Sequence, residues 1–136
     1  MLSHPSQIRD RSGAWMTHWR EQRIRDLRPL VTPGLLAEHS RNPVGAHERH
    51  SAELTLVLNF VRSLCAADKE FIYAIEPFAT YAIGRAAGRG SRPDLSDPER
   101  FLRREDAMHA IFLRRLRRFG LLDDTTAAGV ATRTRA

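Results

Sequence analysis

Histidines are the first side chains in this sequence that could bind a metal ion. His39, His47 and His50 lie in one loop-rich stretch, and the spacing of the last two would place both imidazoles on one helical turn. Structural zinc sites, however, usually add cysteines or a second closely spaced pair of ligands. The only cysteine, Cys65, falls on the apolar face of a predicted helix. We therefore expect no metal ligand in this chain, and we expect His109 to be a hydrogen-bonded residue at the edge of the core rather than a catalytic one.

Arginine is the second residue type that could bind a ligand, because its guanidinium group binds phosphate and carboxylate through two parallel hydrogen bonds. Of the 22 cationic residues only Lys69 is not an arginine, and the net charge is +6. A GC-rich coding genome would explain this bias without any function, and we favour that explanation. The two halves of the chain carry equal net charge, so no basic tail stands out.

The most basic stretch is RRLRR at residues 114–118, inside a predicted helix. On a helical wheel Arg115 borders the buried stripe, whereas Arg114, Arg117 and Arg118 point away from it and are expected to be solvated. Nucleic-acid binding needs basic residues gathered on one face, and no known binding motif is present. The pattern therefore disfavours a nucleic-acid interface.

The sequence patterns of common active sites are also missing. There is no nucleophile motif and no carboxylate pair at a fixed spacing, and the glycines of GRAAGRG at 84–90 match neither the phosphate-loop nor the dinucleotide pattern. We therefore predict no catalytic residue in this chain. Its aromatic and arginine residues are more typical of an accessory subunit.

The best candidate for a binding surface is a stripe on a helix predicted over residues 12–28. Trp15 and Trp19 lie on its apolar side, and Arg23 follows one turn later within that side. Two interpretations remain open: the stem of Arg23 lies along the core edge with its head in water, or the stripe docks on another chain that supplies a carboxylate. Together with Arg115, these residues form the candidate partner interface.

Three further helices must position these side chains. A short helix begins after Thr32 and must stop before Pro43. A third helix, capped by Ser51, is apolar over a broad face and is the expected centre of the core. The last helix, over about residues 103–119, is expected to end at Gly120.

The segment before the last helix is ambiguous. Phe71, Tyr73 and Ile75 alternate with other residues, which predicts a short strand near residues 70–76. Residues 77–87 fit either a fourth helix or a second strand, and we favour the helix.

The whole chain is predicted to be a single mainly α domain over residues 1–136. We expect a compact bundle of four to five helices with a short β segment near residues 70–76. The first nine or so residues are expected to be unstructured, the ordered part to span about 10–122, and residues 123–136 to form a mobile tail.

A cytoplasmic location is expected from three features. The longest apolar run is far shorter than the roughly 20 residues of a membrane helix. The N-terminus has no apolar signal region, and one cysteine cannot form an internal disulfide.

A family resemblance rests mainly on the last helix, which reads F-L-R-R-E-D-A-M-H-A-I-F-L-R-R-L at residues 101–116. Four shorter pieces agree with it in order: D-R-S-G-A-W at 10–15, A-E-H-S-R-N-P-V-G at 37–45, Asn59-Phe60-x-Arg62, and F-I-Y at 71–73. Over roughly residues 10–122 the chain resembles the small (alpha) subunits of bacterial N,N-dimethylformamidases.

The resemblance implies a compact, mostly helical chain bound to a much larger subunit, with two of each chain or a multiple of that. The large subunit would carry a mononuclear iron held by tyrosines and a glutamate, and would hydrolyse dimethylformamide to formate and dimethylamine. Tyr73 and Tyr81 match no such motif, so no ligand is carried over to this chain and no cofactor is expected on it.

The implied function is that of a noncatalytic small subunit that stabilises the large catalytic subunit of an iron-dependent amidohydrolase. Two other classes compete with it. One is a small Arg-rich nucleic-acid-binding or regulatory helical module, and the other is a self-contained homo-oligomer.

Overall fold

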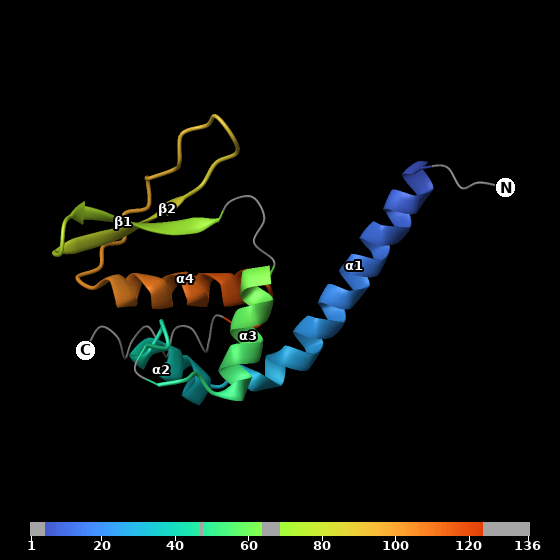
Figure 1. The fold of residues 1–136 in the computed structure, drawn as a ribbon, viewed down its shortest axis with the longest axis horizontal. Helices are drawn as coiled ribbons and strands as arrows, with labels where there is room; N and C mark the ends of the chain where they lie inside the picture. The colour runs from blue at the N-terminus through green and yellow to red at the C-terminus, as the bar shows by residue number, and fades with distance from the viewer. Residues whose placement is uncertain (1–4, 47, 64–68, 124–136) are drawn as a thin grey trace.

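A computed structural model of the chain describes residues 5–46, 48–63 and 69–123, with side chains from residue 13 onward. The elements, in order, are α1 (Pro5–Leu27), η1 (Arg28–Leu30), α2 (Pro33–Arg41), α3 (Ala52–Ser63), β1 (Glu70–Glu76), β2 (Thr80–Arg85) and α4 (Arg104–Arg118) (Figure 1). The described chain is therefore mainly helical, as predicted, but it is not a pure helix bundle. His47, Cys65 and the predicted tail beyond residue 123 lie outside the described residues.

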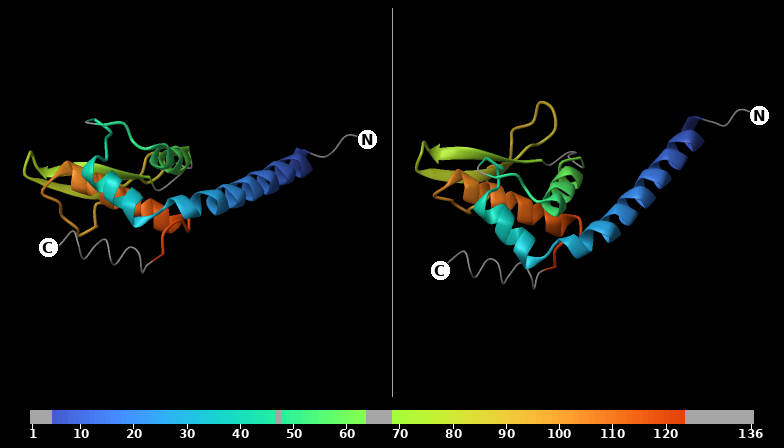
Figure 2. Two further views of the ribbon diagram at one scale, coloured as in Figure 1. Left: turned by 90° about the horizontal axis from the view of Figure 1, so that it is seen from below. Right: turned by 60° about the horizontal axis from the view of Figure 1, so that its bottom comes forward.

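Helix α4 lies between two layers of the body. The hairpin of β1 and β2 covers one side of α4, and α2 packs on another side, with α3 beside it (Figures 1 and 2). Helix α1 leaves the body at η1 and extends away from it in every view. The expectation of a compact bundle is therefore wrong for α1. No helix in the described part of the chain is long and apolar enough to cross a membrane.

Helix α1 also begins earlier than the sequence predicted. Its first residue is Pro5, so the expected unstructured segment of nine residues is too long. Proline is favourable at a first helical position because its φ is already helical and its missing N–H has no partner to lose.

The ends of the other helices follow the predicted capping chemistry. The Thr32 hydroxyl accepts a hydrogen bond from the Leu35 backbone N–H at 3.2 Å, and the Ser51 hydroxyl does the same for Leu54 at 3.2 Å. The Glu38 carboxylate accepts two hydrogen bonds from Ser51, each 2.7 Å long, and so ties α2 to the start of α3. Gly120 ends α4 with a φ of +73°, a conformation that favours glycine.

The main core lies between α2, α3 and α4. Its buried members are Leu27, Leu35, Leu36, Leu54, Val57, Leu58, Phe60, Val61, Phe112, Leu113, Leu116, Leu121 and Leu122. The prediction that α3 lies at the centre of the core is confirmed for its described residues, although Leu56 faces water. In α4 the sequence predicts a buried stripe of Met108, Phe112, Leu116 and Phe119, of which Phe112 and Leu116 are buried and the other two half-buried. This stripe is too narrow, because Ala107 and Ile111 are buried as well in a second cluster under the hairpin.

The favoured helix over residues 77–87 is wrong, because this segment forms the second strand of an antiparallel hairpin. Ile72 pairs with Ile83 and Tyr73 pairs with Ala82. The strand brings Ala82, Ile83 and Gly84 into the interior, where pairing with β1 and packing on α4 outweigh local helix preference. A Cβ atom at position 84 would overlap the Phe71 ring, which lies over Gly84 from the paired position on β1, so the packing of this ring favours glycine there.

Candidate subunit interface

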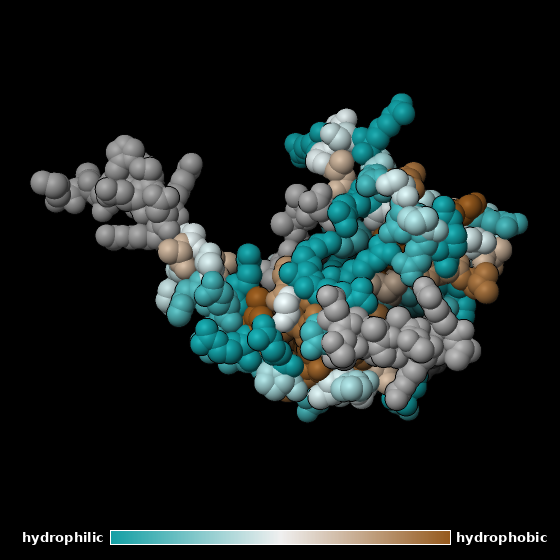
Figure 3. Space-filling view, turned by 180° about the vertical axis from the view of Figure 1, so that it is seen from behind, coloured by the Kyte–Doolittle hydropathy of each residue, from teal (hydrophilic) through white to brown (hydrophobic). Residues whose placement is uncertain are grey.

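Helix α1 presents an exposed aromatic stripe to water. The side chains of Trp15, Met16 and Trp19 are 67%, 51% and 42% exposed. The Trp19 ring lies 6.4 Å from the Phe60 ring of α3, so this end of the stripe meets the body. On the face seen in Figure 3, hydrophobic residues gather where α1 joins the body, and hydrophilic side chains cover most of the remaining surface. Contiguous exposed apolar side chains of this size are typical of interaction sites.

Arg23 lies one turn beyond Trp19 and is half-buried. Its guanidinium group makes no hydrogen bond or ion pair with any residue that the structure describes. The half-buried position of Arg23 agrees with a side-chain stem that lies along the edge of the core. A carboxylate that binds its guanidinium group would have to come from outside the described residues. The interface role of Trp15, Trp19 and Arg23 therefore stays a prediction.

Arg115 and Arg118 bind one buried carboxylate, and we call Glu70, Arg115 and Arg118 the Glu70 clamp. The Arg115 Nε donates to Glu70 Oε2 at 3.2 Å, and Arg118 Nη2 donates to Glu70 Oε1. The Glu70 side chain is only 1% exposed. The predicted place of Arg115 at the edge of the buried stripe is confirmed, but its guanidinium group forms an ion pair with Glu70 of the same chain. A contact of Arg115 with a partner subunit stays a prediction.

The clamp keeps Glu70 ionised. Burial raises the pKa of this carboxyl, but its own backbone N–H and the two arginines outweigh burial and hold the pKa below its usual value. Because Glu70 is the first residue of β1, the clamp joins the hairpin to the last turn of α4.

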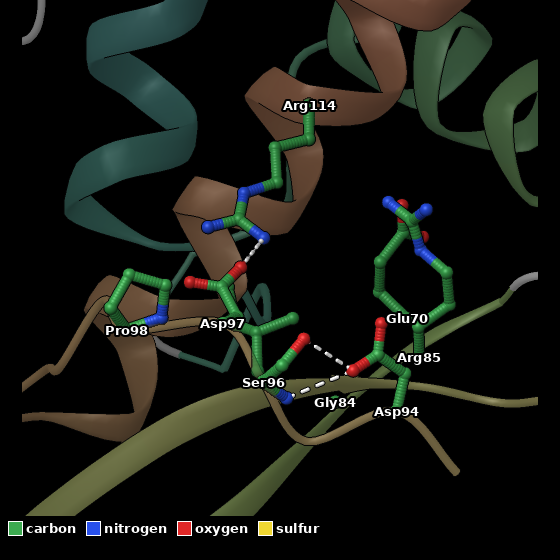
Figure 4. Close-up of a pocket in the computed structure, with 9 residues that line it drawn as sticks. Glu70, Gly84, Arg85, Asp94, Ser96, Asp97, Pro98 and Arg114 are labelled. Carbon is green, nitrogen blue, oxygen red and sulfur yellow. Dashed lines mark hydrogen bonds and ion pairs between the residues drawn. The ribbon is translucent and has the colours of Figure 1, made fainter.

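The prediction that Arg114, Arg117 and Arg118 are solvated is confirmed for Arg117 and in part for Arg118, which is exposed but belongs to the clamp. It is wrong for Arg114, which forms ion pairs of 2.6 Å with both Asp97 and Glu99. Figure 4 shows Arg114 pointing from α4 toward Asp97 on the segment that follows β2. A helical wheel places a residue relative to its own helix only, so it could not reveal a segment that folds back over α4.

The carboxylates of Glu70, Asp97 and Glu99, which bind these arginines, were not predicted from the sequence. The one available signal was the spacing of Arg115 and Arg118, which are three residues apart and therefore neighbours on one helix face. That spacing predicts a shared carboxylate without identifying it.

Two buried histidines meet between α2 and α4. The Nδ1 atoms of His39 and His109 are 2.9 Å apart, and the His39 ring stacks on Phe112 with centroids 4.0 Å apart. The expected hydrogen bond of His109 is confirmed, although this residue is buried rather than at the core edge. The second ring nitrogen of His109, Nε2, is buried and has no described partner.

The environment holds both rings neutral. Burial is the main cause that lowers the pKa of His39 to about 3, helped by the nearby His109, His50 and Arg62. Burial also lowers the pKa of His109, although the Asp106 carboxylate opposes it.

His50 is the other described histidine of the predicted metal-binding pattern, and its hydrogen-bond partner is not a histidine. Its Nε2 lies 2.7 Å from the Asn42 carbonyl oxygen. Among the described residues, no three His, Cys, Asp or Glu side chains gather into a group that could hold a metal ion.

Comparison with known proteins gives one consistent result. The family model described as N,N-dimethylformamidase alpha subunit matches residues 14–126, a range that includes Trp15, Trp19, Arg23 and Arg115. The chain is 36% identical over 114 residues to the N,N-dimethylformamidase alpha subunit of Alcaligenes sp, which covers 82% of this chain and 86% of that protein. It is 32% identical over 117 residues to the N,N-dimethylformamidase alpha subunit of Paracoccus aminophilus, which covers 85% of this chain and 82% of that protein.

Replacing Glu70 with Gln should lower the free energy of unfolding by about 3 kcal/mol, because two arginines lose a buried carboxylate. Urea unfolding at pH 7 measures the loss, with Glu76→Gln on the exposed end of the same strand as the control. The clamp stabilises the wild type fully above the ordinary glutamate pKa of 4.5, and this effect is lost as the pH falls through the lower folded-state pKa. The Glu70→Gln variant should therefore lose less stability in acid, and equal acid dependence of the two proteins would contradict the clamp.

The wild type should also lose stability as the pH falls from 6.5 toward 5. In this range the unfolded chain protonates His39 while the folded chain, with a pKa of about 3, does not. Each such histidine costs up to about 1.4 kcal/mol per pH unit. His39→Phe should make this slope shallower, and the comparison variant is His18→Phe, which removes a histidine from an exposed position of α1. Parallel slopes for wild type and His39→Phe would show that His39 titrates freely in the folded protein.

Proposed function

Because the chain belongs to the family of N,N-dimethylformamidase alpha subunits, we propose that it is the noncatalytic small subunit of an amidohydrolase. This enzyme would hydrolyse N,N-dimethylformamide-type amides to formate and dimethylamine. The observation that carries the proposal is the family match over residues 14–126. The complex would contain two of each chain, or a multiple, and would work in the cytoplasm.

The large subunit would hold the iron and the reacting groups. Two observations support this assignment: among the described residues no three His, Cys, Asp or Glu side chains form a group that could hold a metal ion, and Glu70 is taken up by the clamp. The small subunit would then act by binding and stabilising its partner.

The aromatic stripe of α1 is the surface best suited to that binding. An isolated helix is marginally stable in water, and its stability usually comes from packing one of its faces on another surface. The large subunit would cover Trp15 and Trp19 and supply a carboxylate to Arg23. Tryptophan and arginine are the residue types that contribute most to binding energy at protein interfaces.

The alternative of a nucleic-acid-binding module loses its main support from the geometry of α4. Arg114, Arg115 and Arg118 all bind carboxylates of this chain, which leaves Arg117 as the arginine of the RRLRR run without an ion pair among the described residues. One unpaired arginine does not make the basic face that phosphate contacts require.

The noncatalytic role predicts that the isolated chain neither hydrolyses dimethylformamide nor binds iron. The chain and the complex with its large subunit should be purified separately, supplied with ferrous iron, and assayed for turnover and bound metal. Activity and iron should follow the large subunit. Turnover by the small chain alone, with stoichiometric iron, would overturn the proposal.

The docking role of α1 predicts that Trp15→Ala combined with Arg23→Ala weakens binding to the large subunit about thirtyfold, equivalent to about 2 kcal/mol. The isolated variant should remain folded by circular dichroism, because Trp15 is exposed and Arg23 has no described partner. Arg20→Ala, on an exposed position of the same helix, is the matched control. Normal binding of the double variant would place the interface elsewhere.

A further inference from the structure

A groove of about 420 Å³ runs along one face of α4. Helix α4 contributes side chains spaced by three or four residues along one face, together with Phe112. These are Arg104, Met108, Ile111, Phe112 and Arg115. The side toward α2 and α3 consists of His39, Pro43, Leu58, Val61 and Arg62, and the side toward the hairpin consists of Glu70, Phe71 and Ile72. We call this cavity the α4 groove, and its volume lies within the usual range for binding sites.

The charges of the α4 groove are arranged unevenly. Its floor is apolar and includes the buried, neutral ring of His39. Arg62 and Arg104 line it from exposed positions, and neither makes a hydrogen bond or ion pair with a described residue. Glu70 also lines the groove, but Arg115 and Arg118 neutralise its charge. The groove therefore combines an apolar floor with two cations that are available for binding.

We propose that the α4 groove receives a segment of the large subunit in which an apolar side chain stands next to a carboxylate. The inference rests on the proposed function, since it assigns a second contact to the same complex. The floor would bury the apolar side chain, and Arg62 or Arg104 would bind the carboxylate through two parallel hydrogen bonds. A second copy of this chain suits the groove less well, because the net charge of +6 opposes self-association.

Charge reversal at the rim tests the proposal. Arg62→Glu combined with Arg104→Glu should weaken binding of the small subunit to the large subunit at least about thirtyfold at low salt. Each single groove variant, Arg62→Glu or Arg104→Glu, is compared with Arg117→Glu, which makes the same charge change on an exposed position of α4 that does not line the groove. The affinity of this control should stay within about twofold of the wild type. Binding of the double variant with the affinity of the control would overturn the groove contact.

Two further measurements separate this inference from the proposed function. A photo-crosslinking amino acid in place of Met108 should label a large-subunit peptide that contains Asp or Glu beside an apolar residue, and labelling of a peptide without an acid would overturn the proposal. If charge reversal unfolds the isolated chain, Arg62→Gln with Arg104→Gln should still reduce the affinity and its salt dependence. A wild-type pair that fails to bind would overturn both proposals, whereas a stable pair insensitive to every groove variant would overturn only this one.

Discussion

The carboxylate of Glu70 joins the hairpin layer of this protein to helix α4. A two-stranded hairpin is marginally stable by itself and needs a helix to pack against. Glu70 is the first residue of β1 and binds two arginines near the end of α4, so the start of the hairpin is held on this helix. The ion pairs of Arg114 with Asp97 and Glu99 then hold the segment that leaves the hairpin on the same helix. Because α4 also packs against α2, displacement of this helix would disturb both layers at once.

These ion pairs show that the most arginine-rich segment of the chain is not a free basic surface. A run such as RRLRR suggests an exposed basic surface, but three of its four guanidinium groups are matched by carboxylates from segments distant in sequence. Arginines without an ion pair among the described residues include Arg23 beside the aromatic stripe, and Arg62 and Arg104 along the α4 groove. Binding would thus use cations that the fold leaves free, while the most basic segment serves the fold itself.

Local signals predicted the helices well because capping and periodicity act within a few residues. Thr32 and Ser51 cap the helices that they were expected to cap, and Gly120 ends α4. The strand over 80–85 was missed because Tyr81 and Ile83 fit a helix or a strand equally well until the pairing with β1 decides between them. The partners of Arg114 and Arg118 were missed for a related reason, since ion pairs across 17 and 48 residues depend on the path of the loops. Trp15 and Trp19 were recognised as a stripe because both lie on one helix.

The contact between His39 and His109 has a consequence for the placement of protons. Between two neutral rings with facing Nδ1 atoms, one nitrogen carries hydrogen and the other does not, so the rings must adopt opposite tautomers. A buried N–H without an acceptor is less tolerable than a buried lone pair without a donor, and Nε2 of His109 is the buried atom without a partner. His109 is therefore the ring protonated on Nδ1, and His39 keeps its hydrogen on Nε2. The hydrogen bond thus has a direction, from His109 on α4 to His39 on α2, and the other N–H of the two rings is at Nε2 of His39, the ring that lines the α4 groove.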